Sequence, residues 1–163
     1  MKRYVIDTSS LIELMRTNPI DIYVTVWNRM GELVDGGRLI APRYVLEEIH
    51  RIDDTLAVWA NSHKRMFKQS STGQIRSVTE ILKKFPGLSR SDREGQTADP
   101  FVIAMALEKG RNTIEDYDGE MEKVVVSEEK LRGNKQSIPF VCQSYGIHCI
   151  GIHEMFREEG WKF

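Results

Sequence analysis

The chain alternates short apolar runs with longer stretches in which apolar residues recur every three or four positions. Short apolar runs predict strands buried on both faces, and the spacing of three and four predicts amphipathic helices. Because the two patterns alternate, we expect an α/β fold in which parallel strands are joined by crossover helices. The expected strands are 4–6, 38–41, 124–126 and 149–152.

Prolines, glycines and capping residues set the bounds of the expected helices. A stretch rich in Ser, Gly, Arg and Asp, 87–97, predicts a loop instead. The expected helices run from Asn18 and Pro19 to Gly36, from Pro42 through Trp59, from Ile75 to Pro86, from Asp99 to Gly110, and through Met155 and Phe156.

Composition indicates a compact soluble protein. With 163 residues and 40% hydrophobic residues, we expect residues 1–163 to form a single domain. The 23 basic and 24 acidic residues give a net charge of -1, so any contact with nucleic acid has to come from a local basic patch. The chain has two cysteines and no apolar run long enough for a signal peptide or a membrane span. We therefore expect a cytoplasmic protein without a membrane partner.

Carboxylates follow several of the expected strands, at the edge where open α/β sheets place their functional crevice. Acids gathered there repel one another unless a divalent cation binds between them. Mg²⁺ and Mn²⁺ prefer such oxygen ligands and leave room for a phosphate, so the pattern favours a nuclease or phosphatase. The acids concerned are Asp7, Glu47, Glu48, Asp99, Glu128 and Glu129.

Each acid also has a purely structural interpretation. Asp99 precedes a proline, and helix capping alone explains an aspartate there. Asp7 is unusual at a strand end, but residues 7–10 are all ordinary capping types, so capping and catalysis are equally favoured for it. Glu47 and Glu48 are adjacent in a helix and face different directions, so at most one of them can point into a site.

The chain resembles the PIN-domain ribonucleases and, more closely, the PIN-like family DUF4411. Four motifs carry the resemblance in order, namely YVIDTS at 4–9, VLEEI at 45–49, ADPFVIA at 98–104 and VVSEE at 125–129. The segments IPFVC at 138–142, GIHCI at 146–150 and GWKF at 160–163 resemble the DUF4411 branch. This resemblance implies a Rossmann-like, three-layer α/β/α fold with a mainly parallel sheet of about four to five strands.

The resemblance further implies an endoribonuclease that depends on Mg²⁺ or Mn²⁺ and cleaves phosphodiester bonds by metal-activated water. Such proteins are often the toxins of bacterial type II toxin–antitoxin pairs, so RNA is the expected substrate and an antitoxin protein the expected partner. A homodimer is left open. By the same resemblance, Asp7, Glu48 and Asp99 are expected to bind metal, Glu129 to act as a fourth catalytic acid, and Thr8, Ser9 and Ser127 to supply hydroxyls around them.

Two departures from the PIN pattern qualify this assignment. Many PIN sequences have an aspartate where Glu129 stands, and the choice between Glu128 and Glu129 for the fourth acid stays open. An acidic insertion at 115–122 separates the helix after Asp99 from the next strand. The insertion either masks the site or forms a solvated loop.

Basic residues near the expected acids are candidates for contact with the RNA backbone. A third cluster at 63–65 is interpreted as a solvated face. The candidate RNA contacts are Arg90, Arg93, Lys130, Arg132 and Lys135.

Other chemistry is weighed against this interpretation. A zinc site lacks the paired ligand spacing it needs, and core packing is favoured for its candidate ligands Cys142, His148, Cys149 and His153. The residues Trp27, Trp59 and Trp161 are interpreted as core or interface anchors.

A metal-poor or inactive PIN-fold binding module is the main alternative function. A third hypothesis is phosphotransfer of the haloacid-dehalogenase type with Asp7 as the acceptor. It requires an acid two residues after Asp7, and the serine at position 9 counts strongly against it.

Overall fold

A computed structural model describes residues 1–89, 97–109 and 121–163 of the chain. The strands are β1 (Lys2–Ile6), β2 (Leu39–Pro42), β3 (Phe67–Lys68), β4 (Glu122–Val126) and β5 (Cys149–Ile150). The α-helices are α1 (Thr8–Thr17), α2 (Val24–Asp35), α3 (Arg43–Ile52), α4 (Asp54–Ser62), α5 (Thr72–Lys84), α6 (Asp99–Leu107), α7 (Ile138–Tyr145) and α8 (Ile152–Glu158). Two 3₁₀ turns, η1 (Lys64–Met66) and η2 (Pro86–Leu88), complete the described elements.

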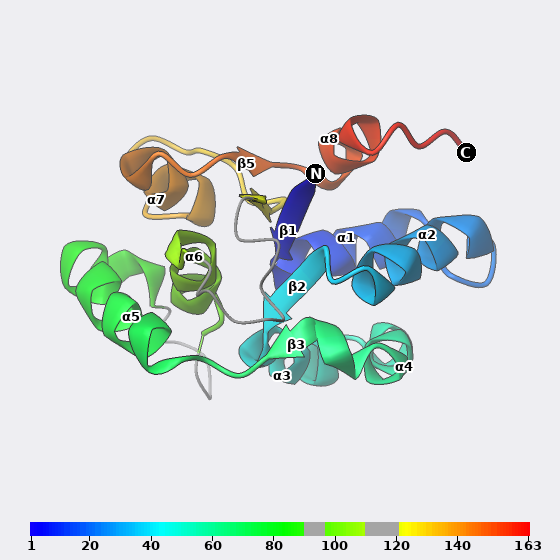
Figure 1. Cartoon of the computed structure of the whole chain (residues 1–163), viewed down its shortest axis with the longest axis horizontal. Helices are drawn as coiled ribbons and strands as arrows, with labels where there is room; N and C mark the ends of the chain where they lie inside the picture. The colour runs from blue at the N-terminus through cyan, green and yellow to red at the C-terminus, as the bar shows by residue number, and fades with distance from the viewer. Residues whose placement is uncertain (90–96, 110–120) are drawn as a thin grey trace.

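The five strands form one sheet in the order β3-β2-β1-β4-β5, and every described pair is parallel. Helices cover both faces, with α5, α6 and α7 on one side of the sheet and α1, α2, α3 and α4 on the other (Figure 1). The expected three-layer α/β fold is confirmed. From β1 the chain first moves toward β2 and β3 and later returns to β4 on the other side of β1, so the switch point lies between β1 and β4.

Apolar residues from both helical layers and the sheet form the core. Residues 4–6 of β1 and 124–126 of β4 are fully buried, which is why these strands have continuous apolar runs and not alternating patterns. The rings of Trp27 and Trp59 meet edge to face with centroids 5.0 Å apart, and both are buried. Their expected role in the core is therefore confirmed.

Hydrogen bonds hold the C-terminal segment against the amino end of the sheet, near β1. Arg38 makes two hydrogen bonds to the Glu159 carboxylate, of 2.8 and 2.5 Å, and the hydroxyl of Tyr4 donates to Glu159 Oε1 over 2.7 Å. Trp161 packs on Phe156 with ring centroids 5.2 Å apart. The end of the sheet opposite to Asp7 is thus closed by specific polar contacts.

Several expected helices have different bounds in the structure. The helix expected from Asn18 begins at Val24, because Pro19 initiates a turn in which its carbonyl accepts from the backbone N–H of Tyr23 over 2.8 Å. The helix expected from Pro42 through Trp59 is two helices. It breaks at Asp53, whose side chain accepts from the N–H of Leu56 over 2.9 Å and caps α4.

The α6 helix also differs from expectation at both ends. Asp99 is its first residue and Ala98 its N-cap, so the expected capping position is shifted by one. The helix ends at Leu107 and not at Gly110, which lies outside the described residues. Lys123 donates to the carbonyls of Met105 and Glu108 over 3.0 and 2.6 Å and satisfies the C-terminal end of the helix.

Besides the two 3₁₀ turns, the strands and helices that the sequence pattern does not predict are α1, β3 and α7. The strand expected at 149–152 ends at Ile150, because α8 begins at Ile152. Within the described ranges, no helix has the length and apolar character needed to cross a bilayer.

Candidate functional site

Asp7 lies at the carboxyl end of β1 and is the N-cap of α1. Its Oδ1 accepts from the backbone N–H of Ser10 over 3.1 Å and from the hydroxyl of Ser9 over 2.8 Å. Its Oδ2 accepts from the hydroxyl of Ser127, at the end of β4, over 2.8 Å. The structural interpretation of Asp7 as a helix cap is therefore confirmed, and the contact with Ser127 goes beyond capping.

The Asp7 carboxyl is only 2% exposed, and its ionisation is costly. The pKa of Asp7 is raised to about 6, chiefly by burial and in smaller part by the charge of Glu129, while the hydrogen bonds from Ser9, Ser127 and Ser10 lower it. Among the described residues, no lysine or arginine forms an ion pair with Asp7. At neutral pH the carboxylate is therefore ionised and compensated by hydroxyl and amide dipoles.

Glu48 is buried on α3, with 3% of its surface exposed, whereas its neighbour Glu47 is exposed. This confirms that only one of the two adjacent glutamates points inward. Glu48 Oε2 accepts from the hydroxyl of Thr8 over 2.6 Å, and Oε1 accepts from the backbone N–H of Ala98 over 2.9 Å. The glutamate therefore links the first residue of α1 to the residue that precedes Asp99.

The two glutamates after β4 have different roles in the structure. Glu128 Oε1 accepts from the N–H of Ile152 over 2.6 Å, at the start of α8. Glu129 Oε2 accepts from the N–H of Ile138 over 2.9 Å, at the start of α7, and its own N–H donates to the Ser127 hydroxyl over 3.1 Å. The Ser127 hydroxyl that accepts from the N–H of Glu129 also donates to Asp7, and the charge of Glu129 raises the pKa of Asp7, so both observations favour Glu129 as the acid next to Asp7.

Hydrogen bonds thus connect the acids through their neighbours. Asp7 is joined to Glu129 through Ser127, and Glu48 connects Thr8, the residue after Asp7, to the segment of Asp99, which is half-buried. Across residues 1–89, 97–109 and 121–163, no group of three or more His, Cys, Asp or Glu side chains is arranged to hold a metal ion. Two sets of hydrogen bonds, one at Asp7 and one at Glu48, therefore meet at the adjacent residues Asp7 and Thr8, and the expected metal ligands do not form a three-ligand cluster.

The donor set nevertheless suits a hard divalent cation. The ligands on offer are oxygens, and Mg²⁺ keeps several waters and often binds only one or two carboxylates of the protein. A carboxylate has about four lone-pair positions, and protein donors occupy three of those of Asp7, which leaves about one for a cation. The buried charge of Asp7 next to that of Glu129 is the electrostatic setting that a cation relieves.

Residues 4–163 match the model of a family described as Domain of unknown function (DUF4411). The protein belongs to the DUF4411 family. Neither the curated proteins nor the solved structures contain a match to the chain. The DUF4411 part of the resemblance is confirmed, while the relation to PIN-domain ribonucleases stays a prediction.

The basic residues expected to contact RNA are only partly within the described structure of this DUF4411 protein. Lys130, Arg132 and Lys135 are exposed in the loop that joins β4 to α7, directly after Glu129. Arg90 and Arg93 lie outside the described residues, and so do residues 110–120, which contain most of the acidic insertion. The contact of Arg90 and Arg93 with RNA and the role of the acidic insertion therefore stay predictions.

The residues of the rejected zinc site are spread between core and surface. Cys142 is fully buried in α7, where contact with Cys149 and burial raise the pKa of its thiol. His148 and His153 are exposed. Core packing is confirmed for Cys142, whereas both histidines are at the surface of this DUF4411 protein.

Sequence reasoning missed the backbone donors of the site. The N–H groups of Ala98 and Ile138 hold Glu48 and Glu129, and neither residue type carries a chemical signal. The N–H of Ser10 could have been found, because an aspartate cap accepts from the residue three positions later. The other two contacts depend on how α3, α6 and α7 are placed in three dimensions.

We expect Asp7→Asn to stabilise the DUF4411 protein in metal-free buffer. Because the pKa of Asp7 is about 6 in the fold against 3.8 ordinarily, the folded state holds its proton more tightly, and wild type loses stability as pH rises from about 4 to about 6. An amide keeps the Ser10 cap without this cost. The expected gain in unfolding free energy at pH 7.5 is about 1–2 kcal/mol, narrowing toward pH 4, measured by urea denaturation. A less stable Asp7→Asn at pH 7.5 would contradict it.

Ser127→Ala should have the opposite effect. The substitution removes the donor to Asp7 Oδ2 and the acceptor of the Glu129 N–H, which leaves buried polar groups unpaired. We expect a loss of about 1–3 kcal/mol in unfolding free energy. The matched control is Ser144→Ala, at an exposed serine whose hydroxyl bonds within its own helix. Equal effects of the two substitutions would show that Ser127 has no special role.

Proposed function

We propose that this DUF4411 protein is an endoribonuclease that depends on Mg²⁺ or Mn²⁺ and is centred on Asp7. One observation carries the proposal, namely a buried carboxylate with a raised pKa at the switch point of a parallel sheet, next to a second acid. Groups with perturbed pKa values in such a crevice are candidates for chemistry, because a fold has no structural need to bury an unpaired charge. The resemblance to PIN-domain ribonucleases gives the proposed reaction.

Following the resemblance, Asp7, Glu48 and Asp99 are the residues proposed to bind the cation, with Glu129 as a fourth acid. Since no three acidic side chains of the described residues are grouped to hold an ion, water molecules are proposed to complete these contacts. When bound, the cation supplies positive charge for the phosphate oxygens and lowers the pKa of a water molecule. Both Glu48 oxygens already accept protein hydrogen bonds, so Glu48 also acts as a positioning residue that fixes the start of α6 relative to α1.

The hydroxyls of the site have an orienting role in this proposal. Ser9 and Ser127 donate to different oxygens of Asp7 and so fix the plane of the carboxylate. Ser127 also accepts the N–H of Glu129, so the two acids keep a constant relation to each other. A site held in this way needs little reorganisation when charge develops on a phosphate.

RNA is the proposed substrate, and the toxin of a type II toxin–antitoxin pair is the proposed biological role, with an antitoxin as partner. The exposed Lys130, Arg132 and Lys135 follow Glu129 directly and support a polyanionic substrate. The toxin role rests on the resemblance to PIN-domain ribonucleases.

A second candidate function is a binding module of the same fold without catalysis. It is favoured by the lack of a three-ligand acidic group among the described residues and by the protein hydrogen bonds that Glu48 already accepts, one on each oxygen. The two candidates differ in their response to metal, since a module without a resident cation gains nothing from Mn²⁺.

The deciding experiment compares wild type with Asp7→Asn on single-stranded and structured RNA, with Mn²⁺ and then with chelator. We expect wild type to cleave RNA only with metal and Asp7→Asn to lose at least about 100-fold in rate, since the charge of Asp7 is proposed to hold the cation. Mn²⁺ should also raise the melting temperature of wild type and not of Asp7→Asn. Asp53→Asn, at the aspartate that caps α4, is the matched control and should retain activity.

Two outcomes would decide against the nuclease. Equal metal-dependent cleavage by wild type and Asp7→Asn would remove Asp7 from the chemistry. Absence of both cleavage and metal stabilisation in wild type would favour the binding module.

The loop after Glu129 gives a further prediction. Replacing Lys130, Arg132 and Lys135 together by glutamine should lower the slope of log binding constant against log salt by about 2, because each contact with a single strand releases about 0.7 counterion. Replacing Arg16, Arg29 and Arg157 by glutamine is the control with the same change in charge, at exposed arginines that pair with acids of their own helices. Equal slopes in the two triple variants would refute the role of the loop.

A further inference from the structure

A largely apolar groove lies beside the candidate site, between α5, α6 and the first turn of α3. Its volume is about 490 Å³, within the range of small-ligand sites. Among the described residues none of its lining side chains is acidic, and one, Lys83, is a cation. The lining residues are Tyr44, Ile75, Val78, Thr79, Leu82, Lys83 and Phe101.

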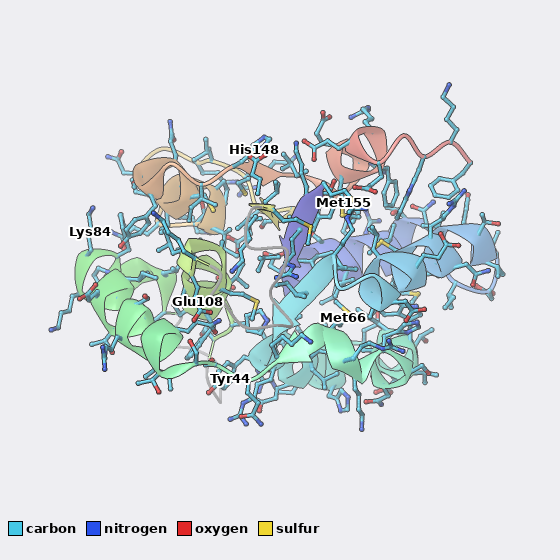
Figure 2. All side chains as sticks on the ribbon, viewed as in Figure 1. Tyr44, Met66, Lys84, Glu108, His148 and Met155 are labelled. Carbon is cyan, nitrogen blue, oxygen red and sulfur yellow. The ribbon has the colours of Figure 1, made fainter. Side chains whose placement is uncertain are left out.

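Tyr44 forms the aromatic wall of this groove. Its ring packs against Phe101 with centroids 4.3 Å apart, and the guanidinium of Arg43 lies 5.1 Å from the centre of its ring. Figure 2 labels Tyr44 at the periphery of the molecule, near the lower end of the sheet. An aromatic ring is thus combined with two cations, Arg43 and Lys83, around an apolar floor.

The groove is close to the acids because of α3. Tyr44 precedes Glu48 by four residues, which places both on one side of the helix about 6 Å apart along its axis. Phe101 comes from the first turn of α6, which begins at Asp99. Tyr44 therefore connects the starts of two helices that carry predicted site acids.

We propose that this groove binds one unpaired nucleobase of a single-stranded RNA, stacked on Tyr44, with the adjoining phosphates near Arg43 and Lys83. The inference rests on the proposed function, whose substrate it narrows to RNA with at least one unstacked base near the cleaved bond. Aromatic side chains flanked by cations are the usual way in which proteins hold unpaired bases.

The charge around the groove favours RNA over a protein as its ligand. Among the described residues, the charged groups that line the groove or contact its aromatic wall are Lys83 and Arg43, and these cations complement a polyanion. Arg43 is exposed, and its contact with Tyr44 is a weak surface cation–π interaction that base stacking can replace. In the proposed complex the guanidinium of Arg43 contacts a phosphate of the RNA in place of the Tyr44 ring.

The test measures binding of a fluorescent ten-nucleotide single-stranded RNA by anisotropy, with chelator present so that no cleavage occurs. Tyr44→Ala should bind about 5- to 100-fold more weakly than wild type, the range expected for the loss of one base stack. Tyr44→Phe keeps the ring and should bind within about twofold of wild type. Unchanged affinity in Tyr44→Ala would overturn the proposal.

An abasic scan makes the test specific to the base. Replacing one nucleotide at a time by an abasic unit should weaken binding to wild type at one position, and that position should have no effect on Tyr44→Ala. A flat scan with wild type would overturn the proposal. Because the scan changes only the RNA, it remains informative if Tyr44→Ala folds poorly.

Two neighbouring lysines provide a matched pair. Lys83 lines the groove, whereas the ammonium of Lys84 lies over the rings of Phe85 and Tyr145, 5.4 and 5.2 Å from their centres. Lys83→Gln should weaken binding severalfold and Lys84→Gln should not. Equal effects would overturn the proposal.

The binding result and the cleavage result can fail separately. Loss of affinity in Tyr44→Ala, with no cleavage by wild type, would support the base site and refute the nuclease. Metal-dependent cleavage by wild type with normal binding by Tyr44→Ala would support the nuclease and refute the base site. If Tyr44→Ala changed only the association state of the protein in gel filtration, the groove would be a contact between copies and the proposal would be overturned.

Discussion

The hydrogen bond from Ser127 to Asp7 is the contact on which the rest of the site depends. It spans the carboxyl ends of β1 and β4, the neighbouring strands between which the chain order reverses. Parallel register sets Ile6 against Val126, and the N–H of Asp7 donates to the carbonyl of Val126 over 3.0 Å. The next residue of each strand must therefore meet the other, so strand pairing alone brings the serine hydroxyl to the carboxylate.

Burial of Asp7 without an ion pair among the described residues costs stability, and the surrounding hydroxyls only partly offset that cost. A fold selected for stability alone would keep a serine or asparagine at this cap, since both cap a helix without a charge. The cation site proposed for Asp7 would account for a carboxylate at this position. The same trade between stability and activity is common where a site needs a group that its surroundings disfavour.

Local sequence signals predicted the part of the site that depends on single elements. The apolar runs located β1 and β4, and the geometry of adjacent helical residues correctly limited the inward acid to one of Glu47 and Glu48. The contacts between different elements could not be predicted from the sequence, because they depend on tertiary packing. The hydrogen bond from Ala98 to Glu48 joins α6 to α3, and β3, with two residues, is too short to have a pattern. The break at Asp53 was missed because the apolar spacing continues across it.

Helix α3 connects the candidate site and the proposed base groove, and this connection has a mechanical consequence. Glu48 and Tyr44 each contact the first turn of α6 or the residue before it, through Ala98 and Phe101. The start of α6 is thus held at two points one helical turn apart on α3. A base stacked on Tyr44 would lie next to Phe101, in the first turn of the helix that begins at Asp99, so that binding at the groove would orient the phosphate relative to the acids. Placing both the base groove and the acids on helices is a more precise arrangement than placing either on a loop.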